Sequence, residues 1–392
     1  MKKRINRSEL VFTIVVSIAC VIIALLPIHF GEPVSKDAER VPAKILSADN
    51  SDLESYGAIH VGGQRLTFKV LRGKFKGEIL EAHNSLIGKL ELDKLFQAGD
   101  KALVTIGLKP EGDIAYITVV DHYRINTELI LFIIFVLGLV WYAGITGLKA
   151  LLSFVFTVLT IWKLLIPGFL IGIQPVLLSL LLVSIMTAAI IFLVGGTNKK
   201  GLVAFIGAEA GIALTCLLSV LFGRAFKIHG AIKPFSETLL SSGYPHLDLT
   251  AIFQSGIFLA AAGAVMDIAM DVSASMCEVK EKRPEIGMKE LLLSGFQVGR
   301  AVIGTMTTTL LFAYSGSFTA LLMAFMAKGV PLINILNLSY VSSEILQTLT
   351  GSFGLVMVAP LTAFAGSYIY TKSTKTTKIQ SDAIEDNKRL AK

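Results

Sequence analysis

Charged residues and cysteines are both scarce in this chain of 392 residues. Only 17% of the residues are charged and 53% are hydrophobic, a balance that excludes an ordinary soluble enzyme of this length. The three cysteines, Cys20, Cys216 and Cys277, lie in or beside apolar runs without CxxC or metal-ligand spacing, so they imply neither a disulfide framework nor a metal site. A phosphate-binding glycine loop and the HExxH and GxSxG motifs are missing too, so we expect no enzyme activity and no cofactor.

Long apolar runs are what the chain has instead. They lie at roughly 10–28, 129–147, 148–166, 174–194, 201–222, 251–275, 291–314 and, less cleanly, 353–370. Each is long enough to cross a bilayer at about 1.5 Å rise per residue. We therefore predict a membrane all-α helical bundle of about eight spans, with the lipid bilayer as its permanent partner.

Basic residues indicate the orientation of these spans. The formal net charge of +7 comes from Lys and Arg in short loops and at the chain ends, which is typical of cytoplasmic loops and does not indicate nucleic-acid binding. The first apolar run follows a basic start and lacks a small-x-small cleavage site, so residues 1–30 are expected to form an uncleaved anchor with a cytosolic N-terminus. Residues 372–392 then form a cytosolic basic tail.

Residues 31–125 have a different composition, with charges of both signs and many glycines. Polar and apolar residues alternate in stretches such as 65–70 and 102–106, which is typical of strands with one buried face. We predict a small antiparallel β domain, for which an OB-like barrel is one candidate architecture. Because the anchor crosses once, the domain is expected on the extracytoplasmic side, either as a structural cap or as a sensing or docking module.

The last part of the polytopic core, which we place at 126–371, is irregular. The apolar stretch 318–327 is too short to cross, so a re-entrant or broken helix is expected over 316–338. Residues 341–350 carry polar side chains at helical spacing. We expect an amphipathic piece there, which the glycines of 351–354 interrupt.

Two aspartates inside an apolar run give the strongest functional signal. Asp267 and Asp271 are four residues apart, so they share one face of a predicted spanning helix. A charge at the centre of a span costs roughly 2.5 to 3.5 kcal/mol on insertion scales, so the pair needs a partner, a proton, a cation or water. Counting from the predicted cytosolic loops places Asp267 and Arg300 each roughly 13 Å from the inner edge, with Glu209 at a similar level.

From these charges we predict a membrane transport or channel protein for a small solute or ion, coupled to protons or cations. In this hypothesis Asp267, Asp271 and Glu209 bind the cation or proton, because one arginine cannot neutralise three carboxylates. Arg300 is their charge partner.

Two helix faces complete the hypothesis. Small residues line the aspartate helix at Gly256, Ala260 and Gly263. The expected pathway lining is Gln297, Thr307, Thr308 and Glu344. Because small residues let backbones approach closely, a homo-oligomer is compatible with these faces.

Other interpretations stay open. Asp267 and Arg300 could form a buried ion pair that only fixes helix register. The chain could also be a non-transporting envelope scaffold or sensor whose β domain docks an envelope protein partner. An intramembrane aspartyl protease is disfavoured, because its two aspartates face each other across two helices and the GxGD pattern is missing here.

Several ordered segments resemble one known family. Residues 263–271 (GAVMDIAMD) with the charged loop after them, and residues 343–355 (SEILQTLTGSFGL) with 360–363 (PLTA), resemble the YibE/F family of bacterial multi-pass membrane proteins. The resemblance covers about residues 126–370 and extends more loosely through the anchor and the β domain. It implies a bacterial cytoplasmic membrane location, an extracytoplasmic N-terminal domain and a common membrane core. It supplies no site residues.

Overall fold

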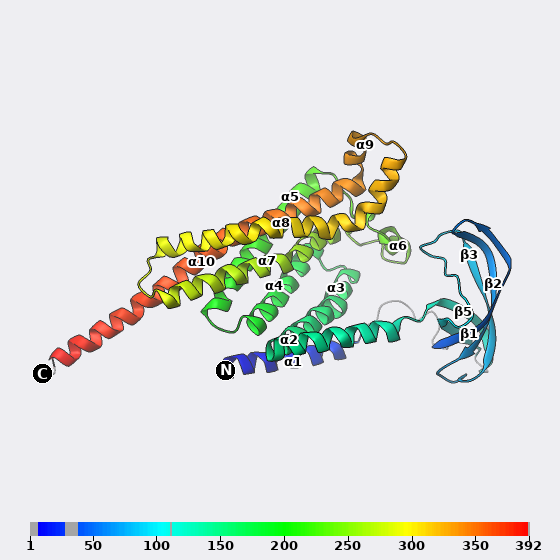
Figure 1. Ribbon diagram of the computed structural model, residues 1–392, viewed down its shortest axis with the longest axis horizontal. Helices are drawn as coiled ribbons and strands as arrows, with labels where there is room; N and C mark the ends of the chain where they lie inside the picture. Colours follow the sequence, from blue (N-terminus) through cyan, green and yellow to red (C-terminus); the bar gives the residue numbers. More distant parts are fainter. Residues whose placement is uncertain (1–6, 28–37, 110–111, 391–392) are drawn as a thin grey trace. The chain divides into compact units, whose positions relative to one another are not determined.

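The computed structural model describes residues 7–27, 38–109 and 112–390 (Figure 1). The chain divides into two compact units. One comprises Met1–Ile28 and Tyr142–Lys392, where the described elements are helices, and the other, His29–Trp141, contains the described strands.

The strand unit is a small antiparallel sheet that nearly closes on itself, as the alternating pattern predicts. Its strands are β1 (Ala38–Tyr56), β2 (Ile59–Val70), β3 (Ile79–Ile87), β4 (Lys101–Leu108) and β5 (Ile114–His122). They are ordered β3-β2-β1-β4-β5, and β3 also contacts β5, so the sheet curls into a near-barrel. Apolar residues of alternate positions fill the interior, with Phe68 and Phe96 fully buried.

A buried amide pair ties the loop before β4 to the sheet. The Gln64 side chain accepts from Phe96 N at 3.0 Å and donates to Phe96 O at 3.0 Å. Asn84 Nδ2 donates to Gln64 Oε1 at 3.0 Å. Both amides are thereby satisfied, which is the condition for burying them.

The remaining elements are helical. They are α1 (Arg7–Leu25), α2 (Ile125–Thr160), η1 (Ile161–Leu165), α3 (Ile166–Leu170), α4 (Pro175–Val194), α5 (Lys199–Ala225), η2 (Gly230–Ile232), α6 (Ser236–Ser241), α7 (Leu249–Lys282), α8 (Met288–Ala327), α9 (Leu332–Asn337) and α10 (Ser339–Leu390). Within the described ranges, six helices are long and apolar enough to cross a membrane, or up to seven when the bent α8 is included.

The count of six or seven candidate helices is lower than the predicted eight spans partly because two predicted spans lie in one helical stretch. The apolar runs at 129–147 and 148–166 fall in a single helical stretch, Ile125–Leu170. Gly144 breaks it, with φ 55° and ψ −127°, a conformation that only glycine adopts at little cost. The count of about eight remains a prediction.

The chain after residue 316 differs from the expectation at one point. Two segments of α8, Met288–Gly316 and Phe318–Ala327, meet at a bend of 64°, where a broken or re-entrant helix was predicted. The expected interruption at 351–354 is wrong, because α10 runs through it without a break. A Cβ on Gly351 would lie 3.1 Å from Leu310, and one on Gly354 would overlap Thr215. The glycines serve close helix packing there.

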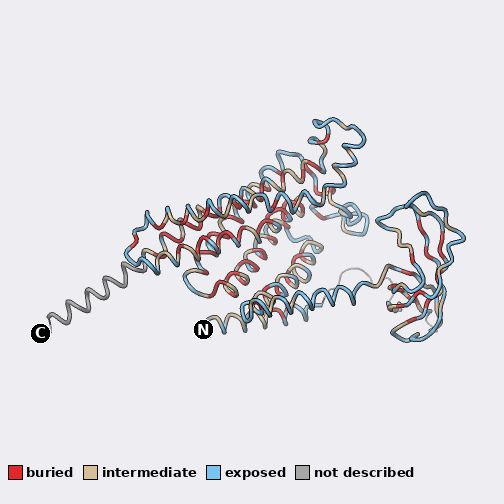
Figure 2. The backbone as a smooth tube through the Cα atoms, in the orientation of Figure 1, coloured by how far each residue is buried: buried red, intermediate tan, exposed pale blue. Residues whose placement is uncertain are grey.

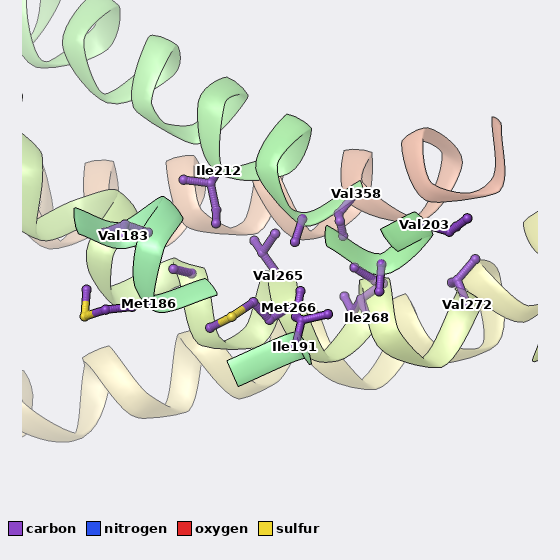
Figure 3. Packing of buried hydrophobic residues seen from close by; sticks show 14 of the residues in the cluster. Val183, Met186, Ile191, Val203, Ile212, Val265, Met266, Ile268, Val272 and Val358 are labelled. Atoms are coloured by element: carbon purple, nitrogen blue, oxygen red, sulfur yellow. The ribbon is translucent and has the colours of Figure 1, made fainter. Parts of the chain in front are cut away.

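Helix α7 lies at the centre of the helical unit and packs against α4, α5, α8 and α10. In Figure 2, buried residues recur along α4 and α7. Figure 3 shows side chains of α4 (Val183, Met186, Ile191), α5 (Val203, Ile212) and α10 (Val358) gathered around Val265, Ile268 and Val272 of α7.

Helix α1 is part of this packing. Near its start, Glu9 Oε2 pairs with Lys149 Nζ at 2.9 Å, and both side chains are largely buried. Past its end, Lys163 Nζ donates to the carbonyl of Leu26 at 2.8 Å. Since residue 9 meets 149 and residue 26 meets 163, α1 and the helical stretch 145–170 run parallel.

Candidate functional site

One face of α7 is open along the whole predicted stripe. Gly256, Ala260, Gly263, Asp267 and Asp271 are exposed, although the residues between them are mostly buried. A Cβ added at Gly256 or Gly263 would meet nothing within 4 Å. The structure therefore brings the two aspartates together on an accessible strip of small residues, as their spacing predicts.

A cavity of about 250 Å³ lies at the Leu249 end of this stripe. Gly256 forms part of its wall together with Lys233, Ser236, Phe253 and Gln347. Gly256 and Asp267 are eleven residues apart on one helix, which is about 16 Å. The cavity and the aspartates are thus joined by an open helix face.

Lys233 pairs with Glu344 on the wall of this cavity. Its Nζ lies 2.5 Å from Glu344 Oε1 and 5.5 Å from the ring centroid of Phe253. The Glu344 side chain is only 13% exposed, so the lysine neutralises a carboxylate that is nearly withdrawn from solvent. The sequence predicted Glu344 on the pathway but did not identify Lys233 as its partner.

Glu344 itself lines a second cavity. This space of about 240 Å³ lies between α8 and α10, and its lining is largely apolar, including Leu311, Phe318 and Leu349. Thr348 adds a hydroxyl to the wall. The Lys233–Glu344 ion pair therefore connects the two cavities, because Lys233 lines the one beside α7 and Glu344 lines the one between α8 and α10.

Glu209 occupies a different place from the aspartates. Ser184 Oγ of α4 donates to its Oε2 at 2.6 Å, while its Oε1 is buried without a hydrogen-bond partner among the described residues. Within the described part of the chain, no hydrogen bond or ion pair joins Glu209 to Asp267 or Asp271. The three carboxylates predicted to bind the cation or proton are thus not joined by direct contact.

The polar stripe of α8 is also accessible. Gln297, Arg300 and Thr308 are exposed, and Thr307 is half-buried. The hydroxyls of Thr307 and Thr308 donate to the carbonyls of Ile303 and Thr305 in their own helix. Among the described residues Arg300 forms no ion pair with Asp267, so its role as charge partner stays a prediction.

A polar contact that the sequence did not reveal closes the other end of α7. Ser273 Oγ donates to the carbonyl of Lys200 at 2.7 Å, and Tyr370 OH donates to the carbonyl of Ser273 at 3.1 Å. Ser273 is fully buried, and Tyr370 is only 5% exposed. These bonds fasten α5, α7 and α10 to one another within two turns of Asp271.

In the described residues, no group of three or more His, Cys, Asp or Glu side chains could hold a metal ion.

Comparison with known proteins connects this site to a family. No curated protein and no solved structure matches the chain. The family model described as YibE/F-like protein matches residues 131–372, which is more than half of the chain and includes the whole candidate site. The chain belongs to the YibE/F-like protein family.

Proposed function

We propose that this protein is a membrane transport or channel protein for a small solute or ion, coupled to protons or cations through intramembrane carboxylates. Asp267 and Asp271 bind the cation or proton, and Glu209 supplies a further carboxylate on the neighbouring helix pair. Gln297, Thr307, Thr308 and Glu344 line the route. The partners are the bilayer, the unidentified solute and further copies of the chain.

The open face of α7 is the observation that carries this proposal. It leads from the cavity beside Lys233 to two carboxylates, and small residues keep it clear of side chains. Ionisable groups inside spans are costly and usually face a cavity or a partner, so their position on the accessible side favours a functional role. If Asp267 and Arg300 only fixed helix register, a direct ion pair between them would be expected.

The parallel course of α1 and 145–170 supports the orientation that we propose. With a cytosolic N-terminus, α1 leads out to an extracytoplasmic β domain. The stretch 145–170 then also runs outward, because it meets α1 at both ends. Residues 125–143 must therefore return across the bilayer, which brings the number of spans to eight. This arrangement suits a bacterial cytoplasmic membrane.

A non-transporting envelope scaffold or sensor is the alternative, and one observation favours it. Ile59, Val61 and Ile87 form an exposed apolar group on neighbouring strands β2 and β3. The five strands curl into a near-barrel, and OB-like barrels use the face of their second and third strands for binding. In this alternative the β domain docks an envelope protein and the buried charges only hold the helices together.

Proton and cation flux through Asp267→Asn protein tests the proposal. The purified variant would be reconstituted in vesicles that contain a pH-sensitive dye, and flux would be driven by K⁺ or Na⁺ gradients. We expect flux in the wild type and its loss in the variant, with unchanged thermal stability. Asp49→Asn, an exposed position of the β domain, is the matched control. Equal flux in Asp267→Asn, or no flux in the wild type, would overturn the proposal in favour of the scaffold.

A further inference from the structure

Three charges at membrane depth lie on accessible helix faces without an ion-pair partner among the described residues. They are Asp267 and Asp271 of α7 and Arg300 of α8. Hydrocarbon is a poor surrounding for any of them, and such groups normally face protein or water. By contrast, Glu9 has an ion-pair partner in Lys149, and Glu209 accepts a hydrogen bond from Ser184. The surroundings of these three charges are therefore incomplete in one copy of the chain.

The glycines beside these charges are open as well. A Cβ added at Gly263 of α7 or Gly304 of α8 would meet nothing within 4 Å. In contrast, a Cβ at Gly207 or Gly211 would collide with α10 or α7, so those glycines are occupied by packing inside the unit. Small residues at open positions let another helix approach closely. The two helices thus present surfaces shaped for a further helix.

The charges on the two surfaces are complementary and lie at similar depth. Asp267 precedes the end of α7 at Lys282 by 15 residues, and Arg300 follows the start of α8 at Met288 by 12 residues. At about 1.5 Å per residue these are roughly 22 Å and 18 Å from the loop that joins the helices. The levels therefore differ by less than one helical turn.

We propose that a second copy of this chain covers these surfaces, and that the partner subunit's Arg300 neutralises Asp267. Rotation about an axis along the membrane normal preserves depth, so each copy meets its neighbour at matching levels in a closed cyclic assembly. The assembly completes the carboxylate site with a residue that one copy cannot place there. The inference rests on the proposed function only for the role of Asp267.

Charge reversal in trans tests this assembly. Asp267→Arg and Arg300→Asp each place like charges at the contact, and we expect each variant alone to associate about tenfold more weakly, equivalent to about 1.4 kcal/mol. Co-expressed with different tags, the two variants restore opposite charges across the contact and co-purify like the wild type. An ion pair within one chain would not be restored by mixing. The measurement is tag co-purification and mass photometry in native lipid nanodiscs.

A steric variant keeps the test independent of charge. Gly263→Leu fills open space, so it leaves the single copy folded but blocks the approaching helix, and we expect loss of association. Gly138→Leu, which also meets nothing within 4 Å, is the matched control and should associate normally. The inference would be overturned if folded single variants stayed associated, or if the mixture failed to recover association; lipid would then be the cover of these surfaces. Assembly without flux would instead refute only the proposed function.

Discussion

The seam between α5 and α10 predicts a large effect from a single methyl group at Gly207. An alanine Cβ there would overlap the Thr362 side chain and lie 2.9 Å from its Cα, whereas carbon atoms normally approach to about 3.5–4.0 Å. The side chain can rotate, but the backbone cannot, so the helices must separate by about 1 Å. Overpacking of this kind costs about 1–3 kcal/mol, and we expect Gly207→Ala to lose about 2 kcal/mol of the free energy of unfolding.

Steric trapping of unfolding in bicelles measures this loss. Gly256→Ala is the matched control, because its Cβ meets nothing within 4 Å and alanine favours the helix by about 0.5–1 kcal/mol. It should be neutral or slightly stabilising. A free energy for Gly207→Ala within about 0.5 kcal/mol of the wild type, or equal losses in both variants, would refute the close packing described for this seam.

Two further predictions concern charged groups. Lys233→Gln leaves the nearly buried Glu344 carboxylate without its cation and should lower the free energy of unfolding by about 1–3 kcal/mol. The loss is smaller than for a fully buried pair because the Lys233 side chain is 37% exposed. Adding Glu344→Gln in the same chain should recover most of the loss in the same unfolding assay, and additive losses would contradict the pairing. In the β domain, the backbone N–H groups of Ile87 and Lys89 hold the pKa of Asp93 below its usual range. Its folded pKa is lowered, so its contribution is complete above the unfolded pKa of about 3.9 and is lost as pH falls through the folded value. Thermal unfolding reported by a fluorophore beside β3 should therefore depend less on acid pH in Asp93→Asn, and an unchanged acid profile would contradict the prediction.

Local sequence patterns were sufficient for the β domain and for most helices. Period-two alternation and turn glycines identify strands because each sheet face repeats every second residue. Apolar length identifies the helical runs for an equally simple physical reason. The family was recognisable because several segments occur in the right order, and the match over 131–372 confirms it.

Rotation of the helices about their axes was the part that sequence could not supply. Residue counting gives the level of Asp267 and Arg300 along their helices, yet it does not give the direction in which they point. Because α7 is buried on most sides, its apolar residues leave only a narrow accessible strip and little amphipathic signal. A shared level was therefore predictable, whereas the separate contact of Glu209 with Ser184 was not.

Contacts between distant residues were equally out of reach. Lys233 and Glu344 are separated by 111 positions, and no sequence pattern around either residue indicates that the other is its partner. The glycines at 351 and 354 mislead in the opposite direction. Local propensity treats them as helix breakers, but neighbouring helices occupy the space that their missing side chains leave.

The ion pair between Glu9 and Lys149 has a consequence for how the protein is made. Lys149 is synthesised 140 residues after Glu9, which at 5–20 residues per second is a delay of roughly 7–30 s. During that interval α1 carries an acidic group whose counterion does not yet exist. Synthesis of α1 and its docking against the stretch 145–170 are consequently separate events in biogenesis, and the docking must wait until translation has passed the β domain.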